Sequence, residues 1–540
     1  MNLGRFMRTV RRLKPEQVWG RAAHLIPRGR PDLRPAPRRR APTAAWVTAA
    51  PKAAAFTPPA TLRFLNEAGD VVRPQDWQGG HDLLWLYNLH YFDDLASSEA
   101  LAAPAPRVAL IDRWLSENPP AAGIGWAPYP TSLRIVNWIK AQLAGFPLPA
   151  AAAESLAVQA RWLAGRLERH LLGNHLLANA KALVFAGCWF EGAEADGWRR
   201  RGLALLAEQL PEQILPDGGH FERSPMYHAI IEEDLLDLLN LARAFGMADE
   251  PVLRDLPGRI AAMRAWLAAM THPDGRISFF NDAAFGIAAE PDELEAYAAR
   301  LRLPAVQQPT EPVAALRPSG YLRLRLGEAV ALIDAAPIGP DYLPGHAHAD
   351  TLSFELSIGA ARVIVNGGTS VYGDGPQRQL ERATASHSTV EIDGENSSEV
   401  WAGFRVGRRA RVRDLTVEAS EDEVSVSAAH DGYRWRRGRP IHRRRWTLTR
   451  SSLTVRDEVD GAVRAAIARF HFAPQVEATA EPGGRRGVLV LPDGRRVAWT
   501  SSAPARIEAD EWRPEFGLRT PSHQLAARLD GAALETRFDW

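Results

Sequence analysis

Three short stretches of the chain concentrate side chains that can transfer protons or bind anions. The first runs from Gly173 to Lys181, the second from Asp217 to His228, and the third from Gly345 to Asp350. Imidazole, phenol, amide and guanidinium groups are the types that enzymes use for proton transfer and for stabilising negative charge. These stretches therefore supply the candidate functional residues.

The first stretch contains Asn174, His175 and Asn179. Asn174 is placed to cap the N-terminus of a helix expected over residues 174–190. His175 and Asn179 are four residues apart, so they share one face of that helix. Helix capping explains this pattern as well as catalysis does.

The second stretch leads into a helix expected over residues 226–246. Ser224 and Pro225 fit the N-cap and first helical positions. Tyr227 and His228 then lie in the first turn, where free backbone N–H groups and the helix dipole favour anions and help a phenol to ionise. The alternative is that Tyr227 is a packing residue at the helix start.

The third stretch alternates His346, His348 and Asp350, which would point to the same side of an extended chain. That arrangement suits a metal ion or an anionic substrate. Asn366 and the segment from Arg382 to His387 follow downstream.

Several common motifs are absent from the sequence. It contains no phosphate-binding G-x-x-x-x-G-K-S/T loop, no G-x-S-x-G elbow, no H-E-x-x-H and no convincing G-x-G-x-x-G after a strand. Nucleotide-driven chemistry and ordinary serine hydrolysis are therefore disfavoured, and no nucleotide or redox cofactor is expected.

Helical spacing of apolar residues dominates the region from about residue 83 to 302. Successive helices without intervening strand patterns favour stacked hairpins, that is, an (α/α) toroid or a solenoid. The expected helices span residues 105–117, 130–145, 151–170, 174–190, 197–212, 226–246, 254–271 and 291–302.

After Pro312 the apolar period changes to two, with Gly, Asp or Asn at the turns. This pattern predicts a second domain, a large antiparallel β-sandwich. The expected domains are a basic, Pro/Ala-rich arm and linker (1–60), the toroid (61–310) and the sandwich (311–540). The chemistry is expected where the last two meet, since pockets favour domain interfaces.

Composition sets further limits. The chain has 540 residues, 46% of them hydrophobic, and a net charge of +1, which fits a folded protein with a large core and argues against a nucleic-acid partner. Its single cysteine, Cys188, excludes an internal disulfide. No apolar run is long enough to span a membrane, and the N-terminus lacks the apolar segment of a signal peptide, so the cytoplasm is the expected location.

Residues 1–40 carry 12 basic side chains and only Glu16 and Asp32 as acidic ones. Such an arm could make a peripheral contact with an anionic membrane or bind an acidic polymer. The alternative is a solvated, partly helical extension. Residues 31–59 are rich in Pro and Ala and are interpreted as a linker.

Seven stretches, spread over both expected domains, resemble the heparinase II/III-like family of polysaccharide lyases. They are WLYNLHYFDDL (85–95), WAPYPTSLRIVNWIK (126–140), GNHLLANAKALVFAG (173–187), DGGHFERSPMYH (217–228), GHAHADTLSFEL (345–356), NGGTSVYG (366–373) and RATASHSTVEIDG (382–394). The resemblance implies a toroid followed by a β-domain. It also implies β-elimination beside a uronic acid in an acidic polysaccharide such as heparan sulfate or alginate.

The resemblance also implies roles for individual residues. Asn174, His175 and His346 would neutralise the substrate carboxylate and handle protons, and Tyr227 would be the catalytic base, acid or both, working below its ordinary pKa of about 10. The expected substrate-binding residues are Asn179, Glu222, Arg223 and Arg382.

Some relatives hold one structural zinc, which implies His348, residue 366 and His387 as ligands here. Asn366 stands where the family has an aspartate, and a neutral amide is a poor zinc ligand. Asp350 is a possible substitute. In the alternative without metal, His348 and His387 join two hairpins by hydrogen bonds.

Two other functions remain open at this point. One is a catalytically silent protein that binds acidic glycans during assembly of envelope polysaccharide. The family resemblance also implies the periplasm or cell envelope as the alternative location. The other is a glycoside hydrolase on the same fold, which needs two opposed carboxylates, with Glu222 and Asp350 as the candidates. The oligomeric state is left open.

Overall fold

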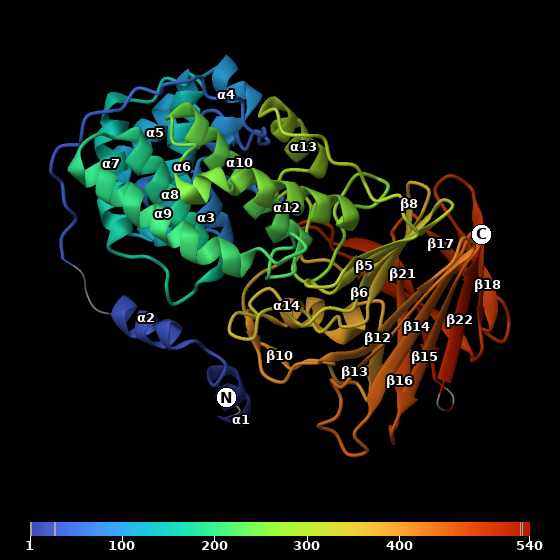
Figure 1. Cartoon of the computed structure of the whole chain (residues 1–540). Helices are drawn as coiled ribbons and strands as arrows, with labels where there is room; N and C mark the ends of the chain where they lie inside the picture. The colour runs from blue at the N-terminus through green and yellow to red at the C-terminus, as the bar shows by residue number, and fades with distance from the viewer. Residues whose placement is uncertain (1–2, 26–28, 530, 532) are drawn as a thin grey trace.

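A computed structural model describes residues 3–25, 29–529, 531 and 533–540. Helices fill the first part of the chain and strands the second (Figure 1). The helices before the large sheets are α1 (Leu3–Val10), α2 (Pro15–Leu25), α3 (Leu83–Tyr91), α4 (Ser98–Ala102), α5 (Ala105–Glu117), α6 (Pro128–Leu143), α7 (Ala150–Ala164), α8 (Gly173–Trp189), α9 (Ala193–Gln213), α10 (Pro225–Ala244), α11 (Pro251–Arg254), α12 (Leu256–Met270) and α13 (Pro291–Arg300).

All eight predicted long helices are present, with ends that differ by a few residues. The largest difference is α7, which ends at Ala164 rather than residue 170 because Gly165 caps it. The turn that follows carries Glu168, which becomes important at the site. None of the described helices is both long enough and apolar enough to cross a membrane.

Helices α8 and α10 form the centre of the helical domain and are buried along almost their whole length. Ion pairs hold α10 in place. Lys52 contacts Glu233, Lys140 contacts Glu233 and Asp237, and Lys181 contacts Asp234 and Asp237. Three of the chain's four lysines are thus used to fix one helix whose first turn carries Tyr227.

The second part of the chain folds into two large antiparallel sheets. One has the order β12-β13-β14-β15-β22-β19-β18-β17, and the other β20-β21-β16-β8-β7-β6-β5-β4, with β9 paired to β16. Apolar residues of both, such as Phe354 and Trp446, pack in one shared core, which makes the domain a β-sandwich.

The strands of the sandwich are β4 (Val313–Leu316), β5 (Tyr321–Leu326), β6 (Ala329–Asp334), β7 (Phe354–Ile358), β8 (Ala361–Val365), β9 (Val390–Ile392), β12 (Val412–Ala419), β13 (Glu423–His430), β14 (Ile441–Thr449), β15 (Ser452–Asp460), β16 (Ala466–Phe472), β17 (Glu477–Ala480), β18 (Arg486–Val490), β19 (Arg496–Ser501), β20 (Ala505–Trp512), β21 (Thr520–Arg528) and β22 (Ala533–Asp539). Smaller elements are β1 (Phe56–Thr57), β2 (Thr61–Phe64), β3 (Glu67–Asp70), β10 (Val400–Trp401), β11 (Arg405–Val406) and the short helix α14 (Pro376–Glu381).

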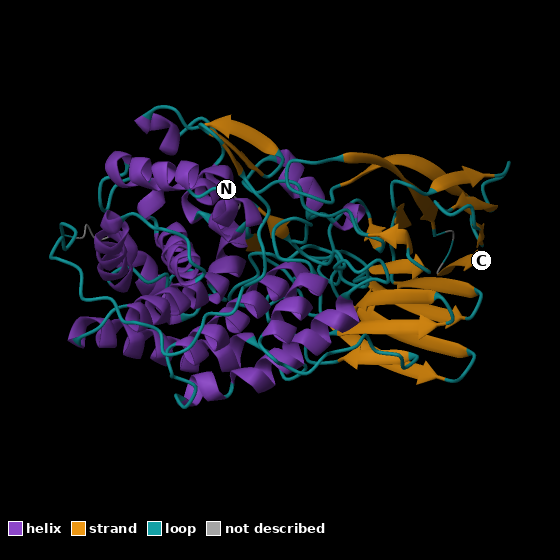
Figure 2. Cartoon of the chain, turned by 90° about the horizontal axis from the view of Figure 1, so that it is seen from above, coloured by secondary structure: helices purple, strands orange, loops and turns teal. Residues whose placement is uncertain are grey.

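The two domains share an apolar interface. Trp266 and Met270 of α12 pack with Tyr321 of β5 and with Val330 and Leu332 of β6. Figure 2 shows helices on one side and strands on the other, with many loops gathered where they meet. These junction loops carry most of the candidate residues.

The segment interpreted as a linker is packed against the helical domain. Arg40 donates to the carbonyl of Trp189, Thr43 donates to that of Ala244, and Ala50 is buried. The interpretation of residues 31–59 as a linker is therefore corrected. Their small Ala side chains and their Pro residues let this extended segment lie close to the helices.

Candidate active site

The N-terminus of α10 presents Tyr227 at the domain junction. Ser224 is the N-cap and accepts a hydrogen bond from the Tyr227 amide at 3.1 Å, with Pro225 as the first helical residue. Both features agree with the sequence prediction. The Tyr227 ring stacks on His346 with ring centroids 3.7 Å apart, and its hydroxyl lies 2.9 Å from that of Tyr372.

His346 comes from the loop after β6, so the pair joins the two domains. Its Nδ1 lies 2.9 Å from Asp282, which fixes Nε2 toward Asn174 and Glu222 at 3.5 and 3.4 Å. Tyr227, His346 and Asn174 are therefore brought together as predicted. Residues 346–350 form a turn and a bend rather than a β-strand, and the side chains of His346 and His348 both reach Asp282.

Asp282 organises this part of the site. Its carboxylate contacts His346, His348 and, through two guanidinium nitrogens, Arg378. Burial alone would favour the neutral acid, but Arg378 and the two histidines outweigh it and hold the pKa of Asp282 well below its usual value. Asp282 is thus a buried anion that orients two imidazoles.

Helix α8 adds a second group at the same place. It begins at Gly173, so Asn174 is not the N-cap that the sequence suggested. Both the amide and the side-chain nitrogen of Asn174 donate to Glu222 instead, at 3.0 Å each. Gly173 is required here, because a Cβ atom would come within 2.3 Å of Glu222.

His175 pairs with Glu168 in the turn after α7, with 3.1 Å between Nδ1 and the carboxylate. Asn179, one turn along α8, donates to the same carboxylate at 2.9 Å. The predicted shared face of His175 and Asn179 is therefore present, and Asn179 holds Glu168 rather than facing open space. Burial works against a charged imidazole, yet Glu168 outweighs it and raises the pKa of His175.

The pKa of the Tyr227 phenol differs from the prediction, which expected a value below the ordinary one. Burial, with smaller contributions from Tyr372 and Asp282, raises its pKa well above the ordinary value. The helix terminus does not overcome that desolvation, so Tyr227 is a neutral phenol in this structure.

Two predicted substrate-binding residues face elsewhere. Arg382 is fully buried and donates to the carbonyls of Ala347, Ala402 and Arg405. Arg223 is also buried and donates to the carbonyls of Ser319 and Phe221. Both predictions are wrong, because these guanidinium groups hold the loops together by backbone contacts.

Glu222 is buried between Asn174 and His346. Burial favours its neutral form, but His346, His220 and the Asn174 hydrogen bonds outweigh that effect and lower its pKa. Asp350, the other predicted carboxylate, is buried and accepts a hydrogen bond from the Asn281 amide at 3.0 Å. These contacts do not set up an opposed carboxylate pair of the kind that hydrolysis needs.

The implied zinc position has two suitable nitrogens. Nε2 of His348 lies 2.8 Å from Asp282 and Nδ1 of His387 lies 2.8 Å from the carbonyl of Ala383, while the opposite nitrogens face each other at 3.1 Å. Burial lowers the pKa of both imidazoles, which favours the neutral forms that bind metals.

The third ligand is missing from this arrangement. The Asn366 oxygen accepts from the Ser388 amide at 3.1 Å, and its nitrogen lies 3.3 Å from the Ser353 hydroxyl. Within the described ranges, no group of three or more His, Cys, Asp or Glu side chains is arranged to hold a metal ion. The residues present therefore do not complete a zinc site, and the contacts agree with the alternative in which His348 and His387 join two loops.

Sequence reasoning missed Asp282, Arg378, Tyr372, Glu168 and Tyr129. Tyr372 was visible within the matched stretch NGGTSVYG, and Tyr129, whose ring lies 4.4 Å from His175, within another. Arg378 lies over Tyr372, 4.9 Å from its ring. Asp282 and Glu168 lie in loops without a local signal, so only the fold identifies them.

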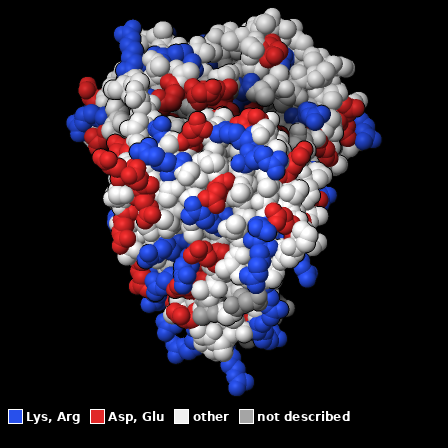
Figure 3. All heavy atoms as spheres, turned by 90° about the vertical axis from the view of Figure 1, so that its right-hand side faces the viewer, with Lys and Arg blue, Asp and Glu red and all other residues white. Residues whose placement is uncertain are grey.

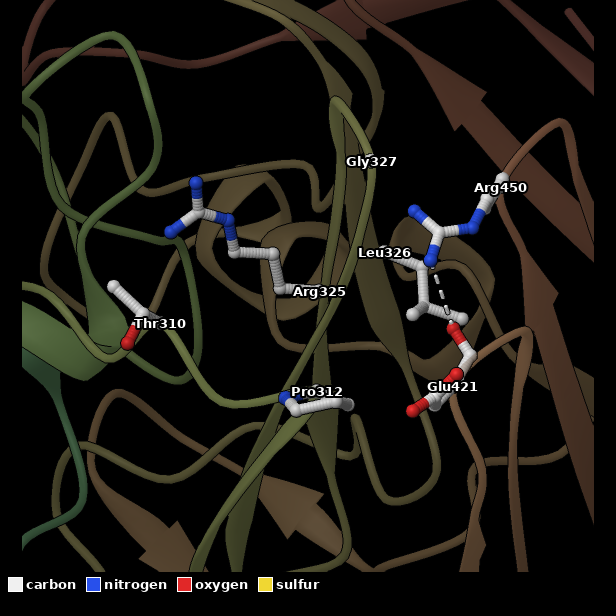
Figure 4. Close-up of a pocket in the computed structure, with 7 residues that line it drawn as sticks. All are labelled: Thr310, Pro312, Arg325, Leu326, Gly327, Glu421 and Arg450. Carbon is white, nitrogen blue, oxygen red and sulfur yellow. Dashed lines mark hydrogen bonds between the residues drawn. The ribbon is translucent and has the colours of Figure 1, made fainter.

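A separate depression of about 410 Å³ lies on the sandwich. Its lining residues are Thr310, Pro312, Arg325, Leu326, Gly327, Glu421 and Arg450 (Figure 4). Arg450 donates to the backbone carbonyl of Glu421 at 3.2 Å. None of the predicted site residues lines it, so the depression is distinct from the candidate active site.

Comparisons with known proteins agree with this architecture. The solved structure of a heparinase III superposes with a TM-score of 0.68 at 17% identity, covering 86% of this chain and 78% of that one. The heparan sulfate lyase HepC of Pedobacter heparinus gives 0.59 at 18% identity, covering 88% and 79%. At these identities the likeness establishes the fold.

Sequence relatives include a heparin-sulfate lyase of Bacteroides stercoris, 27% identical over 246 residues. The match covers 42% of this chain and 36% of that protein, so the chain spans about a third of the length of this relative. The FtsZ-localized protein C of Caulobacter vibrioides is 27% identical over 392 residues, covering 69% of this chain and 64% of that protein.

Two family models match consecutive parts of the chain. Residues 150–297 match the model described as heparinase II/III N-terminus, and residues 308–540 match heparinase II/III-like, C-terminal. The first contains Asn174, Tyr227 and Asp282, and the second contains His346 and Arg378. The chain therefore belongs to the heparinase II/III-like family.

Proposed function

We propose that the protein is a polysaccharide lyase that cleaves an acidic, uronate-containing glycan by β-elimination. The observation that carries the proposal is the stack of Tyr227 on His346, held beside Asn174 at the start of α8. The lyase names of the Bacteroides and Pedobacter relatives support the same reaction class.

The substrate carboxylate needs neutralisation, because the proton on the adjacent carbon is otherwise too weakly acidic. Asn174 and His175 lie in the first turn of α8, where the helix dipole favours an anion. Glu168 supports the cationic form of His175. These residues are proposed to bind the uronate carboxylate and to stabilise the charge that develops on it.

Elimination requires one proton acceptor and one proton donor. His346 is proposed to accept the proton from C5 at Nε2, with Nδ1 held by Asp282. The electron pair of the C5–H bond forms the C4=C5 double bond as the C4–O bond breaks. The neutral phenol of Tyr227 gives its proton to the leaving oxygen, and Tyr372 orients that hydroxyl.

The test is the absorbance of unsaturated uronate during incubation with acidic glycans, including heparan sulfate and alginate. Tyr227→Phe should lower the rate by about 10²–10⁴ while the fold is retained, because the phenol proton is lost. Tyr433→Phe, which alters a buried tyrosine of the sandwich whose hydroxyl donates to the carbonyl of Val390, is the matched control and should keep the wild-type rate.

An unchanged rate in Tyr227→Phe would remove this residue from the mechanism. Shortened chains without absorbance would instead indicate hydrolysis. Glycan binding without any cleavage by the wild-type chain would favour the silent binding protein.

A further inference from the structure

The two N-terminal helices carry an exposed apolar surface. In α1, Leu3, Phe6, Met7 and Val10 follow helical spacing along one face, and Leu3 and Met7 are 70% and 58% exposed. In α2, Val18 and Trp19 are 51% and 75% exposed. Single exposed apolar side chains are common on protein surfaces, but four large ones on two successive short helices are a feature of interaction surfaces.

The polar face of α1 is turned toward the body of the protein. Arg8 makes a two-nitrogen contact with Glu399, and Arg5 contacts the same carboxylate at 3.3 Å. Thr9 donates to the Val406 carbonyl and accepts from the Trp401 indole. An amphipathic helix that packed for stability alone would bury its apolar side, so this orientation leaves the apolar side for another contact.

The arm is fixed to both domains. Arg12 contacts Asp341 at 2.8 Å, and Lys14 pairs with Glu212 of α9. The side chain of Gln17 donates to the Tyr342 carbonyl, and Gly20 lies directly against the backbone of His170. Figure 1 shows α1 and α2 lying outside the helical domain, on the side where β10 lies. The apolar surface is thus held in a set position.

Positive charge surrounds this surface. Three arginines, Arg5, Arg8 and Arg408, contact the single carboxylate of Glu399. Arg11 and Arg21 are exposed on the arm. Burial lowers the pKa of Arg409 to about 10 against the opposing effect of Asp341, and the nearby arginines Arg12, Arg11 and Arg411 lower it further.

The face shown in Figure 3 is different. Acidic and basic side chains are interspersed there over the end of the sandwich. Over the whole chain, 65 basic residues nearly balance 64 acidic ones, so the excess in residues 1–40, with 12 basic and two acidic side chains, is a local property of the arm.

We propose that α1 and α2 form a docking surface for an anionic lipid bilayer, with Leu3, Met7, Val18 and Trp19 entering the interface and the flanking arginines contacting headgroups. Interfacial helices combine these features: aliphatic and Trp side chains on one face, basic residues beside them, and too little apolar length to span. Docking would place the loop that carries Tyr342 and His346 next to the membrane, because Gln17 and Arg12 hold that loop.

The test is cosedimentation of the full chain with vesicles of phosphatidylcholine alone or with added phosphatidylglycerol. The wild type is expected to pellet with the anionic vesicles and to stay in the supernatant with the neutral ones, and added salt should weaken the binding. The triple variant Leu3→Glu, Met7→Glu, Trp19→Glu should bind anionic vesicles at least about tenfold more weakly, because apolar burial is replaced by repulsion.

The matched control is the triple variant Val72→Glu, Leu83→Glu, Leu101→Glu, which adds the same number of negative charges at exposed apolar positions outside the arm. It should bind like the wild type, and circular dichroism should show that both variants fold. Equal loss in both variants, or no binding of the wild type to anionic vesicles, would overturn the proposal.

Two other occupants of the surface have distinct outcomes. Suppose that the wild type does not bind vesicles but is retained on an acidic-glycan column, and that the triple variant is not retained. The arm then binds glycan, and the lipid proposal fails. If sedimentation shows a wild-type dimer that the triple variant dissociates, without vesicle binding, the surface joins two copies. Neither readout depends on lyase activity, so the outcome is separate from that of the proposed function.

Discussion

At the scale of single residues, two carboxylates control the imidazoles of the site. Asp282 receives His346, His348 and Arg378, and Glu168 receives His175 and Asn179. Glu168→Gln removes the charge that raises the pKa of His175. Because its pKa is raised, His175 stays cationic at pH values above the ordinary histidine pKa of 6.5. Activity that needs this cation is lost as the pH rises through the pKa of His175 in the folded protein. We therefore expect Glu168→Gln to move the alkaline limb of the kcat/KM profile to lower pH, and histidine titration by NMR to show the same shift without substrate. Ser132→Ala, which removes an acceptor of Asn179 and a hydrogen bond to the Pro128 carbonyl but leaves the Glu168 charge, is the control and should leave the limb in place. An unchanged limb in Glu168→Gln would show that His175 does not set it.

The sequence could predict Asn174, His175, Tyr227 and His346, because they lie in dense polar stretches. It could not predict Asp282, because the side chains that contact its carboxylate lie at least 64 residues away, or Glu168, because it lies in a turn without a pattern.

At the scale of elements, the position of α10 depends on buried charge. Lys181 contacts Asp234 and Asp237, all three deep in the helical domain. Lys181→Met keeps the aliphatic volume but leaves two carboxylates short of a partner, so the free energy of unfolding should fall by about 3–5 kcal/mol. Lys14→Met is the matched control, since its ion pair with Glu212 is partly exposed and should cost about 0–1 kcal/mol. Equal stability of the two variants in urea unfolding would contradict a structural role for the buried pairs.

Helix periodicity predicted α10 and its Ser224 cap well, because those signals are local. The ion pairs could not be predicted, because Lys52, Lys140 and Lys181 come from three separate segments that only the toroid brings together.

At the scale of the whole molecule, the site exists only where the two domains meet. Trp266 of α12 packs against Tyr321 and stacks on His228, one residue after Tyr227. Trp266→Ala should cost about 3–5 kcal/mol of stability, and it should also lower activity per folded molecule because the Tyr227 and His346 halves lose their common support. Trp77→Ala, an equally buried change that packs on His90 of α3 and not at the interface, should cost similar stability and leave the activity of the folded fraction nearly intact. If both variants keep the same activity per folded molecule, the interface does not position the site.

The order of an α-domain and a β-domain was predictable from the change in apolar period near Pro312. The packing of residues 31–59 on the helices was not, since Pro and Ala give no periodic signal.

The masses of the wild-type products distinguish elimination from hydrolysis at this site. Elimination requires that each cleavage of a uronate-containing glycan give two fragments whose masses sum to that of the substrate, with one unsaturated uronate absorbing for each bond broken. Fragments that together carry one additional water per cleavage, without the absorbing double bond, would contradict elimination and assign the site to hydrolysis.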